Sequence, residues 1–266
     1  MKVVDNKDKN IEKAINMIRE AAENLSNIIV LPEMFNCPYD NQKFLEYAET
    51  QSSSKTLKSI SKAARNYGVY VVAGSIPESH KINIYNSSFT FNNRGKIVAV
   101  HRKLHLFDIE IPRSIIFKES ETLSAGDSLT VFDSDHGKIG VAICYDMRFP
   151  EIFRLMALDG AELIVVPGAF NMKTGPAHWE ILIRSRAVDN QVFMVAASPA
   201  RNEELSYVAY GNSMIVNPWG DVLAQAGAEE EIIYADLELS DVEKIRSELP
   251  LLKNRRTDIY DVIKKY

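Results

Sequence analysis

A cysteine stands at a point in the sequence where a reactive thiol would be accessible. Cys144 follows the apolar run 138–143, which predicts a strand, and Pro150 is typical of the first turn of a helix. At such a strand-to-helix elbow, free backbone N–H groups lower the pKa of a thiol and bind an oxyanion, so we expect the N–H of Tyr145 to take part. A lone cysteine is more often a small buried side chain. The polar segment 145–151 favours the reactive role.

Two further charged side chains follow predicted strands. Glu33 comes after the apolar run 28–31 and Pro32, and α/β proteins commonly hold their active sites at the carboxyl ends of strands. Lys103 ends a predicted hairpin strand, where it would be a fixed cation for a developing oxyanion. Both have ordinary alternatives, since most glutamates lie on solvated loops and a lysine can protect a sheet edge. Glu119 by itself carries no signal beyond that of a surface acid.

Three ordered motifs resemble the Glu–Lys–Cys triad of the nitrilase (carbon–nitrogen hydrolase) superfamily, and most closely its omega-amidase branch. They are Leu31-Pro32-Glu33, Arg102-Lys103-Leu104-His105 and Cys144-Tyr145-Asp146, and similar segments cover nearly the whole chain. The resemblance implies that Cys144 is the nucleophile and Glu33 the general base. It also implies that Lys103 stabilises the oxyanion and that Glu119 helps to place the substrate amide. It implies neither a metal nor an organic cofactor.

The resemblance implies a four-layer α-β-β-α sandwich with mixed β-sheets, which usually forms homodimers or larger assemblies. Hydrophobic periodicity agrees with a mixed α/β protein, because apolar residues recur at helical spacing in several segments. The predicted helices are 11–22, 57–64 ending at Gly68, 150–160 and 181–188. The predicted strands are 28–31, 70–73, 87–91, 96–101, 129–132, 138–143, 163–166, 192–197, 213–216 and 232–235. No linker or repeat interrupts the pattern, so we expect one domain over 1–266, with 241–266 on its outside.

The substrate that the resemblance implies is a small amide that carries a carboxylate, such as 2-oxoglutaramate or 2-oxosuccinamate. Arg148, four residues after the cysteine, could bind that carboxylate through its two-pronged guanidinium, or could form an ordinary surface salt bridge. Tyr39, Phe170 and Thr174 resemble lining residues of the omega-amidase pocket. The two aromatic residues are equally plausible as core side chains.

Composition places the 266-residue chain among globular proteins, since 46% apolar and 25% charged residues exclude disorder and collagen. A net charge of −5 argues against general binding to nucleic acid or to anionic membranes. Two cysteines are too few for a disulfide scaffold or a cysteine zinc site. The sequence has no signal peptide and no apolar run of membrane-spanning length, so a cytoplasmic setting is expected.

Alternatives remain at the level of sequence. The amide could belong to deaminated glutathione or to an N-carbamoyl compound, and His105 or His178 could instead support a papain-like Cys–His enzyme. Relatives open with a buried strand, of which 1–5 leaves room only for a stub, so we expect the natural start to lie upstream. If the missing strand disabled the site, the chain would be a non-catalytic binding or assembly protein.

Overall fold

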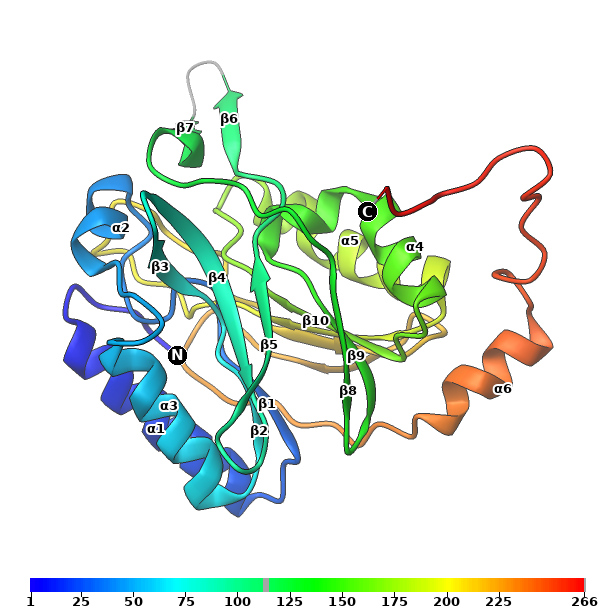
Figure 1. Ribbon diagram of the computed structural model, residues 1–266, viewed down its shortest axis with the longest axis horizontal. Helices are drawn as coiled ribbons and strands as arrows, with labels where there is room; N and C mark the ends of the chain where they lie inside the picture. Colours follow the sequence, from blue (N-terminus) through cyan, green and yellow to red (C-terminus); the bar gives the residue numbers. More distant parts are fainter. Residues whose placement is uncertain (112–114, 266) are drawn as a thin grey trace.

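Four layers build the protein in the computed structural model, which describes residues 1–111 and 115–265 (Figure 1). Two β-sheets pack face to face, and helices cover the outer face of each. The core between the sheets includes Val72, Phe132, Val165 and Phe193. The predicted α-β-β-α sandwich with mixed sheets is confirmed.

The first sheet ends in the strands that precede the predicted base and cation. Its members are β1 (Ile28–Val30), β2 (Tyr70–Val72), β3 (Ile76–His80), β4 (Asn83–Phe91) and β5 (Ile97–Arg102). β1 and β2 run parallel, whereas β4 pairs antiparallel with β2, β3 and β5. Glu33 therefore follows the edge strand β1, and Lys103 directly follows β5.

The second sheet carries the cysteine. Its strand order is β13-β12-β11-β10-β9-β8. The strands are β8 (Thr130–Ser134), β9 (Gly137–Val141), β10 (Leu163–Pro167), β11 (Phe193–Ala197), β12 (Met214–Val216) and β13 (Val222–Gln225). β9, β10 and β11 are parallel, and the continuous apolar run of β10 is buried at every position. Because parallel strands end at one edge of the sheet, the segments after β9 and β10 lie side by side there, and the first of them holds Cys144.

Helices form the two outer layers. α1 (Lys7–Glu23) and α3 (Lys55–Tyr67) cover the first sheet, and α4 (Pro150–Leu158) and α5 (Gly175–Asn190) cover the second (Figure 1). Gly68 ends α3 in the left-handed region at φ 67°, where glycine has no steric penalty. Pro150 opens α4, as the sequence predicts. α5 begins at Gly175, six residues before the apolar pattern indicates.

Short elements complete the site. They are α2 (Asn41–Tyr47), the two-stranded hairpin β6 (Asp108–Ile111) and β7 (Ile115–Lys118), and two 3₁₀ helices, η1 (Glu119–Glu121) and η2 (Cys144–Arg148). The hairpin stands away from the two main sheets (Figure 1). η1 follows it directly and carries Glu119. η2 fills the elbow between β9 and α4 and begins with Cys144.

One strand prediction is wrong. Residues 232–235 form no strand, because Ile232 instead packs its side chain against the core beneath α1 and α3. A groove of about 780 Å³ separates this segment from the edge strand β1. The strand stub at the start of the chain is likewise not in a sheet. Met1 and Val3 are buried, and the Met1 carbonyl accepts a hydrogen bond from the Ala200 N–H at 2.9 Å.

The C-terminal segment lies on the outside, as predicted. It forms α6 (Ser240–Glu248) and then runs as turns and coil through residue 265, returning to the helices of the second sheet, where Leu252 packs against the core (Figure 1). The last residue of the predicted range, 266, lies outside the described residues. Across residues 1–111 and 115–265, no helix has both the length and the apolar character that crossing a membrane requires.

Candidate active site

Four of the predicted site residues meet in one buried cluster. Glu33, Lys103 and Glu119 are 0% exposed, and Cys144 is 3% exposed. They arrive from the ends of β1, β5, the β6–β7 hairpin and β9, so both main sheets contribute. Charged side chains are almost never fully buried unless they are paired. The surface roles that the sequence left open for these carboxylates and this lysine are therefore excluded.

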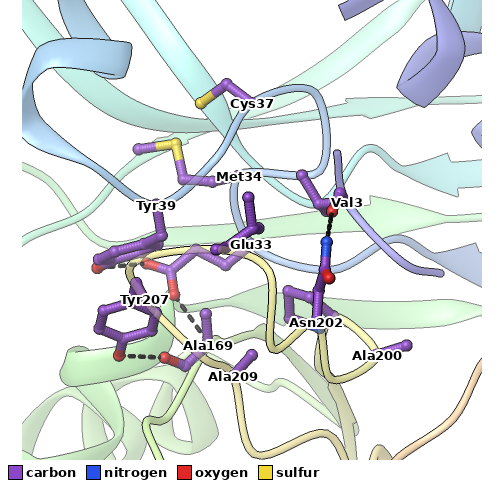
Figure 2. Close-up of a pocket in the computed structure, with 12 residues that line it drawn as sticks. Val3, Glu33, Met34, Cys37, Tyr39, Ala169, Ala200, Asn202, Tyr207 and Ala209 are labelled. Atoms are coloured by element: carbon purple, nitrogen blue, oxygen red, sulfur yellow. Dashed lines mark hydrogen bonds between the residues drawn. The ribbon is translucent and has the colours of Figure 1, made fainter. Parts of the chain in front are cut away.

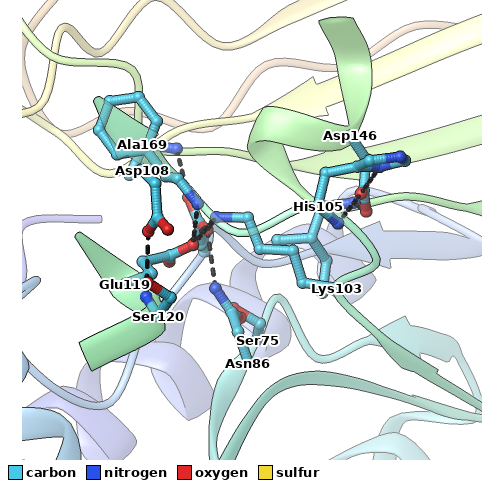
Figure 3. Close-up of polar contacts among 12 residues, drawn as sticks. Ser75, Asn86, Lys103, His105, Asp108, Glu119, Ser120, Asp146 and Ala169 are labelled. Atoms are coloured by element: carbon cyan, nitrogen blue, oxygen red, sulfur yellow. Dashed lines mark hydrogen bonds and ion pairs between the residues drawn. The ribbon is translucent and has the colours of Figure 1, made fainter. Parts of the chain in front are cut away.

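The ammonium group of Lys103 joins the cluster (Figure 3). Its Nζ lies 3.0 Å from Glu33 Oε1, 3.0 Å from Glu119 Oε1 and 3.2 Å from the Tyr39 hydroxyl. Burial lowers the pKa of Lys103, but the negative charges of Glu119 and Glu33 outweigh it and raise that pKa above its ordinary value. An ammonium has three N–H donors, so this environment engages all of them.

Glu33 is held on both of its oxygens. Oε1 accepts a second hydrogen bond from Asn86 Nδ2 at 2.8 Å, and Oε2 accepts one from the backbone N–H of Ala169 at 2.8 Å (Figures 2 and 3). Burial raises the pKa of Glu33, and the ammonium of Lys103 only partly opposes that effect. Glu33 is therefore a fixed carboxylate that takes up a proton more readily than an ordinary glutamate does.

Cys144 occupies a strained backbone position. Its φ of 46° lies in the left-handed region, which costs a non-glycine residue on the order of 1–3 kcal/mol. The carboxylate of Glu33 raises the pKa of the thiol, and the backbone N–H of Ala169 lowers it, so both groups lie beside the sulfur. Burial, and then the charge of Glu33, raise the pKa of Cys144 well above its ordinary value. The sequence-based expectation that elbow donors lower this pKa is wrong, because burial and the neighbouring carboxylate outweigh those donors and favour the neutral thiol.

Tyr39 belongs to the cluster itself as well as lining the adjacent pocket. Its hydroxyl donates to Glu119 Oε1 at 2.5 Å, and its ring stacks on Tyr207 with centroids 4.5 Å apart. The Tyr207 hydroxyl donates to the Ala169 carbonyl at 2.6 Å (Figure 2). Burial raises the pKa of both phenols well above the ordinary value, so both stay protonated. A small pocket of about 20 Å³ is lined by Glu33 and by both of these tyrosines.

Arg148 lies at the end of η2, four residues after the cysteine. Its guanidinium is 5.0 Å from the ring centroid of Phe170 and 5.5 Å from that of Tyr145. Nη1 is 3.2 Å from Nδ1 of His178. The structure therefore brings Arg148 and Phe170 together, next to the turn that holds Cys144.

Thr174 lies in the turn before α5 and is bonded to Asn171. Its hydroxyl donates to Asn171 Oδ1 at 3.1 Å, and the same oxygen accepts the backbone N–H of Thr174 at 2.9 Å. These bonds organise the turn before α5. Phe170, which comes just before this turn, is buried and packs edge-on against Trp179 with centroids 5.0 Å apart.

Comparisons with known proteins agree with this geometry. The family model described as carbon-nitrogen hydrolase matches residues 2–247. The chain belongs to the carbon-nitrogen hydrolase family. It is 49% identical to "Omega-amidase NIT2" of Bos taurus over 96% of this chain and 92% of that protein. It is 51% identical to "Nitrilase homolog 2" of Dictyostelium discoideum, covering 98% and 80%. The structure of Saccharomyces cerevisiae Nit3 superposes with a TM-score of 0.88 at 43% identity, covering 96% and 93%.

Sequence reasoning missed several contributors to this carbon-nitrogen hydrolase site. Asn86, Ala169 and Tyr207 all contact the cluster, but none stands in a sequence pattern that indicates chemistry. Two of them act through a backbone group or an amide, which any local pattern conceals. In the ranges 1–111 and 115–265 of this hydrolase, no three His, Cys, Asp or Glu side chains are arranged to hold a metal ion.

The histidines of the papain-like alternative are engaged elsewhere. Nδ1 of His105 lies 2.8 Å from Asp146 Oδ1, and Nδ1 of His178 faces the guanidinium of Arg148. The group beside the thiol is instead the carboxylate of Glu33. The geometry therefore favours a carboxylate base in this carbon-nitrogen hydrolase over an imidazole.

Proposed function

We propose that this carbon-nitrogen hydrolase is an omega-amidase. It would hydrolyse the ω-amide of small dicarboxylic keto-acid monoamides, such as 2-oxoglutaramate and 2-oxosuccinamate, to the keto acid and ammonia. The observation that carries the proposal is that a thiol, a carboxylate and an ammonium from three distant chain segments are buried in one cluster, in which the ammonium of Lys103 contacts the carboxylate of Glu33 and both charges affect the pKa of Cys144. Relatives named omega-amidase at 49% identity over nearly the whole chain support the substrate class.

The first half of the reaction forms a thioester. The sulfur of Cys144 attacks the amide carbon while its proton moves to the carboxylate of Glu33. That transfer is uphill by about 4 pKa units between the free side chains, or about 6 kcal/mol, and burial raises both pKa values here. We therefore expect the proton to leave as the S–C bond forms. Glu33 then passes the proton to the nitrogen, the C–N bond breaks and ammonia leaves.

The oxygen of the attacked amide becomes negative beside Lys103. All three N–H donors of this ammonium are already engaged by Glu33, Glu119 and Tyr39. Lys103 therefore stabilises the oxyanion through the attraction of its buried positive charge, and it donates a hydrogen bond to the oxyanion only if the substrate oxygen replaces the Tyr39 hydroxyl. The backbone N–H of Tyr145 is the second proposed donor, because the first N–H groups of a helical turn lack intrahelical acceptors. One donor of this kind contributes about 2.7–4 kcal/mol to transition-state stability.

The second half of the reaction releases the acid. Water attacks the thioester carbon while Glu33 takes its proton, and the C–S bond breaks as Glu33 passes that proton to the sulfur, which restores the thiol of Cys144 and the carboxylate of Glu33. The pocket of about 20 Å³ beside Glu33 is large enough for one water molecule. Glu119 holds Lys103 and the Tyr39 hydroxyl in place and is the proposed partner for the substrate amide.

Arg148 is the proposed partner of the substrate carboxylate. It belongs to the same short helix as Cys144 and lies against the ring of Phe170. A guanidinium binds a carboxylate through two parallel hydrogen bonds, and its fixed separation from the thiol would select the length of the substrate. Tyr39 and Thr174 remain proposed lining residues of the substrate pocket.

A substrate comparison tests this proposal. Ammonia release is measured from 2-oxoglutaramate and from a neutral aliphatic amide of similar length, with the natural protein, Arg148→Met and Cys144→Ala. Arg148→Met should raise KM for the keto acid amide about 10- to 100-fold and leave the neutral amide unchanged, because hydrogen bonds to charged groups contribute about 1.5–3 kcal/mol. Cys144→Ala should be inactive on both.

Arg184→Met is the matched control, since Arg184 pairs with Glu180 on the exposed side of α5. Equal losses on both amides after Arg148→Met would refute the carboxylate clamp. Faster turnover of a peptide-like or N-carbamoyl amide would refute the proposed substrate class. A natural protein that hydrolyses no amide would favour the non-catalytic alternative. A homodimer and a cytoplasmic location stay predictions of the sequence.

A further inference from the structure

A second buried carboxylate lies next to the cluster and has no part in the proposed chemistry. Asp146 is two residues after Cys144 and is 0% exposed. Its oxygens interact with nitrogen atoms at four positions: the backbone N of Ile143 at 3.0 Å, the backbone N of His105 at 2.9 Å, His105 Nδ1 at 2.8 Å and His101 Nε2 at 3.1 Å. The side chain of Asp146 thus links η2 of the second sheet to β5 and the residues that follow it in the first.

The two histidines stand symmetrically about the ammonium-bearing residue. His101 is two residues before Lys103, and His105 is two residues after it. Figure 3 shows His105 and Asp146 beside the Lys103 side chain. The third anchor, Ile143, directly precedes Cys144, so the carboxylate contacts one residue on each side of Lys103 in the sequence and the residue before Cys144.

Asp146 is charged in these contacts. Burial alone would raise the pKa of Asp146, but the hydrogen bonds from His101 and His105 outweigh it and hold that pKa well below its ordinary value. Asp146 is therefore ionised throughout the physiological range. A buried ionised carboxylate costs desolvation energy, which makes it a poor choice for stability alone. Its partners lie in two sheets that carry opposite halves of the site.

We propose that Asp146 is a positioning residue that fixes the thiol of Cys144 relative to the ammonium of Lys103. The inference rests on the proposed roles of those two groups. The Ile143 N–H bond holds the turn in which Cys144 keeps its left-handed backbone, and the two His105 bonds hold the chain that follows Lys103. Without the carboxylate of Asp146, Cys144 and Lys103 would stay in place within their own sheets. The distance between the thiol and the ammonium would then depend only on how the two sheets pack.

The expected consequence is a loss of turnover with little loss of binding. A misplacement of about 1 Å between reacting groups can cost about 100-fold in rate. Asp146→Asn should therefore lower kcat about 100-fold on both the keto acid amide and the neutral amide, with KM changed less than about threefold. Rates are expressed per reactive Cys144, counted by alkylation and peptide mass on the folded fraction isolated by gel filtration, so that unfolded molecules do not enter the comparison.

Glu78→Gln is the matched control. Glu78 is 1% exposed, accepts two hydrogen bonds from Arg102 at 2.8 Å each and lies on β3, within the same sheet as its partner. It is thus a buried ionised carboxylate that holds the residue next to Lys103 without reaching the cysteine turn. Its variant should lower the melting temperature and leave kcat per reactive thiol near that of the natural protein. Similar losses of kcat in both variants would overturn the proposal.

His105→Gln keeps the experiment decisive if Asp146→Asn does not fold. It leaves Asp146 ionised and the backbone bond of residue 105 intact, and should lower kcat about tenfold, because one charge-assisted hydrogen bond is weakened. If Asp146→Asn folds, unchanged kcat per thiol in that variant overturns the positioning role. If it does not fold, unchanged kcat per thiol in His105→Gln overturns it. If the natural protein showed no preference for the keto acid amide over the neutral amide, that result would instead refute the proposed substrate. The kcat ratio on the neutral amide would still measure the positioning role.

Discussion

Replacing Lys103 by methionine separates the electrostatic role of the Lys103 side chain from its packing. Methionine nearly preserves the apolar length of the side chain but removes the charge and all three contacts to Glu33, Glu119 and Tyr39. Removing one partner of a buried ion pair costs about 3–5 kcal/mol of unfolding free energy. Loss of one oxyanion-stabilising group lowers kcat about 100- to 1000-fold. Both losses are expected in the same variant at neutral pH.

The loss of stability should depend on pH in a defined direction. Without the ammonium, burial and the charge of Glu119 are opposed less strongly and raise the folded-state pKa of Glu33 further above its ordinary value near 4.3. A carboxyl group with a raised folded-state pKa destabilises the protein when it is ionised. The stability deficit of Lys103→Met relative to the natural protein should therefore shrink as the pH falls from 7 through that raised pKa.

Urea unfolding at several pH values and ammonia release measure these two effects. Lys43→Met is the matched control, because Lys43 also contacts two carboxylates, Asp5 and Glu46, but at the surface. The control should keep near-normal turnover and show no such pH-dependent deficit. If Lys103→Met retained kcat within about threefold of the natural value, set against the 100-fold or larger loss expected for an oxyanion group, the reasoning would be refuted.

Two further predictions concern the carboxylate and its support. Glu33→Gln should abolish amide hydrolysis while Cys144 can still be alkylated; in the natural protein, kcat/KM should fall as the pH drops through the raised pKa of Glu33, because the protonated form cannot act as base. A pH–rate profile without that acid limb would contradict the assignment. Tyr207→Phe removes one hydrogen bond to the Ala169 carbonyl and should lower the unfolding free energy by about 0.5–1.5 kcal/mol, measured in urea, with kcat reduced less than by Lys103→Met. A larger catalytic loss than that of Lys103→Met would give Tyr207 a direct chemical role.

Local patterns were sufficient for most of the fold. Buried apolar runs identified β1 and β10, and turn residues between alternating segments identified the β4–β5 and β8–β9 hairpins. Pattern reasoning failed at 232–235, where an apolar β-rich run packs its side chains without pairing its backbone. It also missed β3, β6, β7 and β13, which are only four or five residues long. Backbone pairing depends on a partner strand, which a local window of sequence does not contain.

The same distinction between local patterns and distant contacts applies to the site. Glu33, Lys103 and Cys144 were predicted because each follows a predicted strand and stands in a motif. The pKa of Cys144 was predicted in the wrong direction, because the elbow is visible in the sequence but its burial beside Glu33 is not. Tyr207 was missed because its links to the site, a hydrogen bond to the Ala169 carbonyl and stacking on Tyr39, join it to residues far away in the chain.

The most direct test of the central claim is to trap the acylated enzyme. The protein is mixed with 2-oxoglutaramate, quenched in acid during turnover, digested and mapped by peptide mass. We expect the acyl group on the peptide that contains Cys144 and none on the peptide that contains Cys37, the other buried cysteine. Acylation of Cys37 instead, or continued ammonia release by Cys144→Ala, would contradict the account.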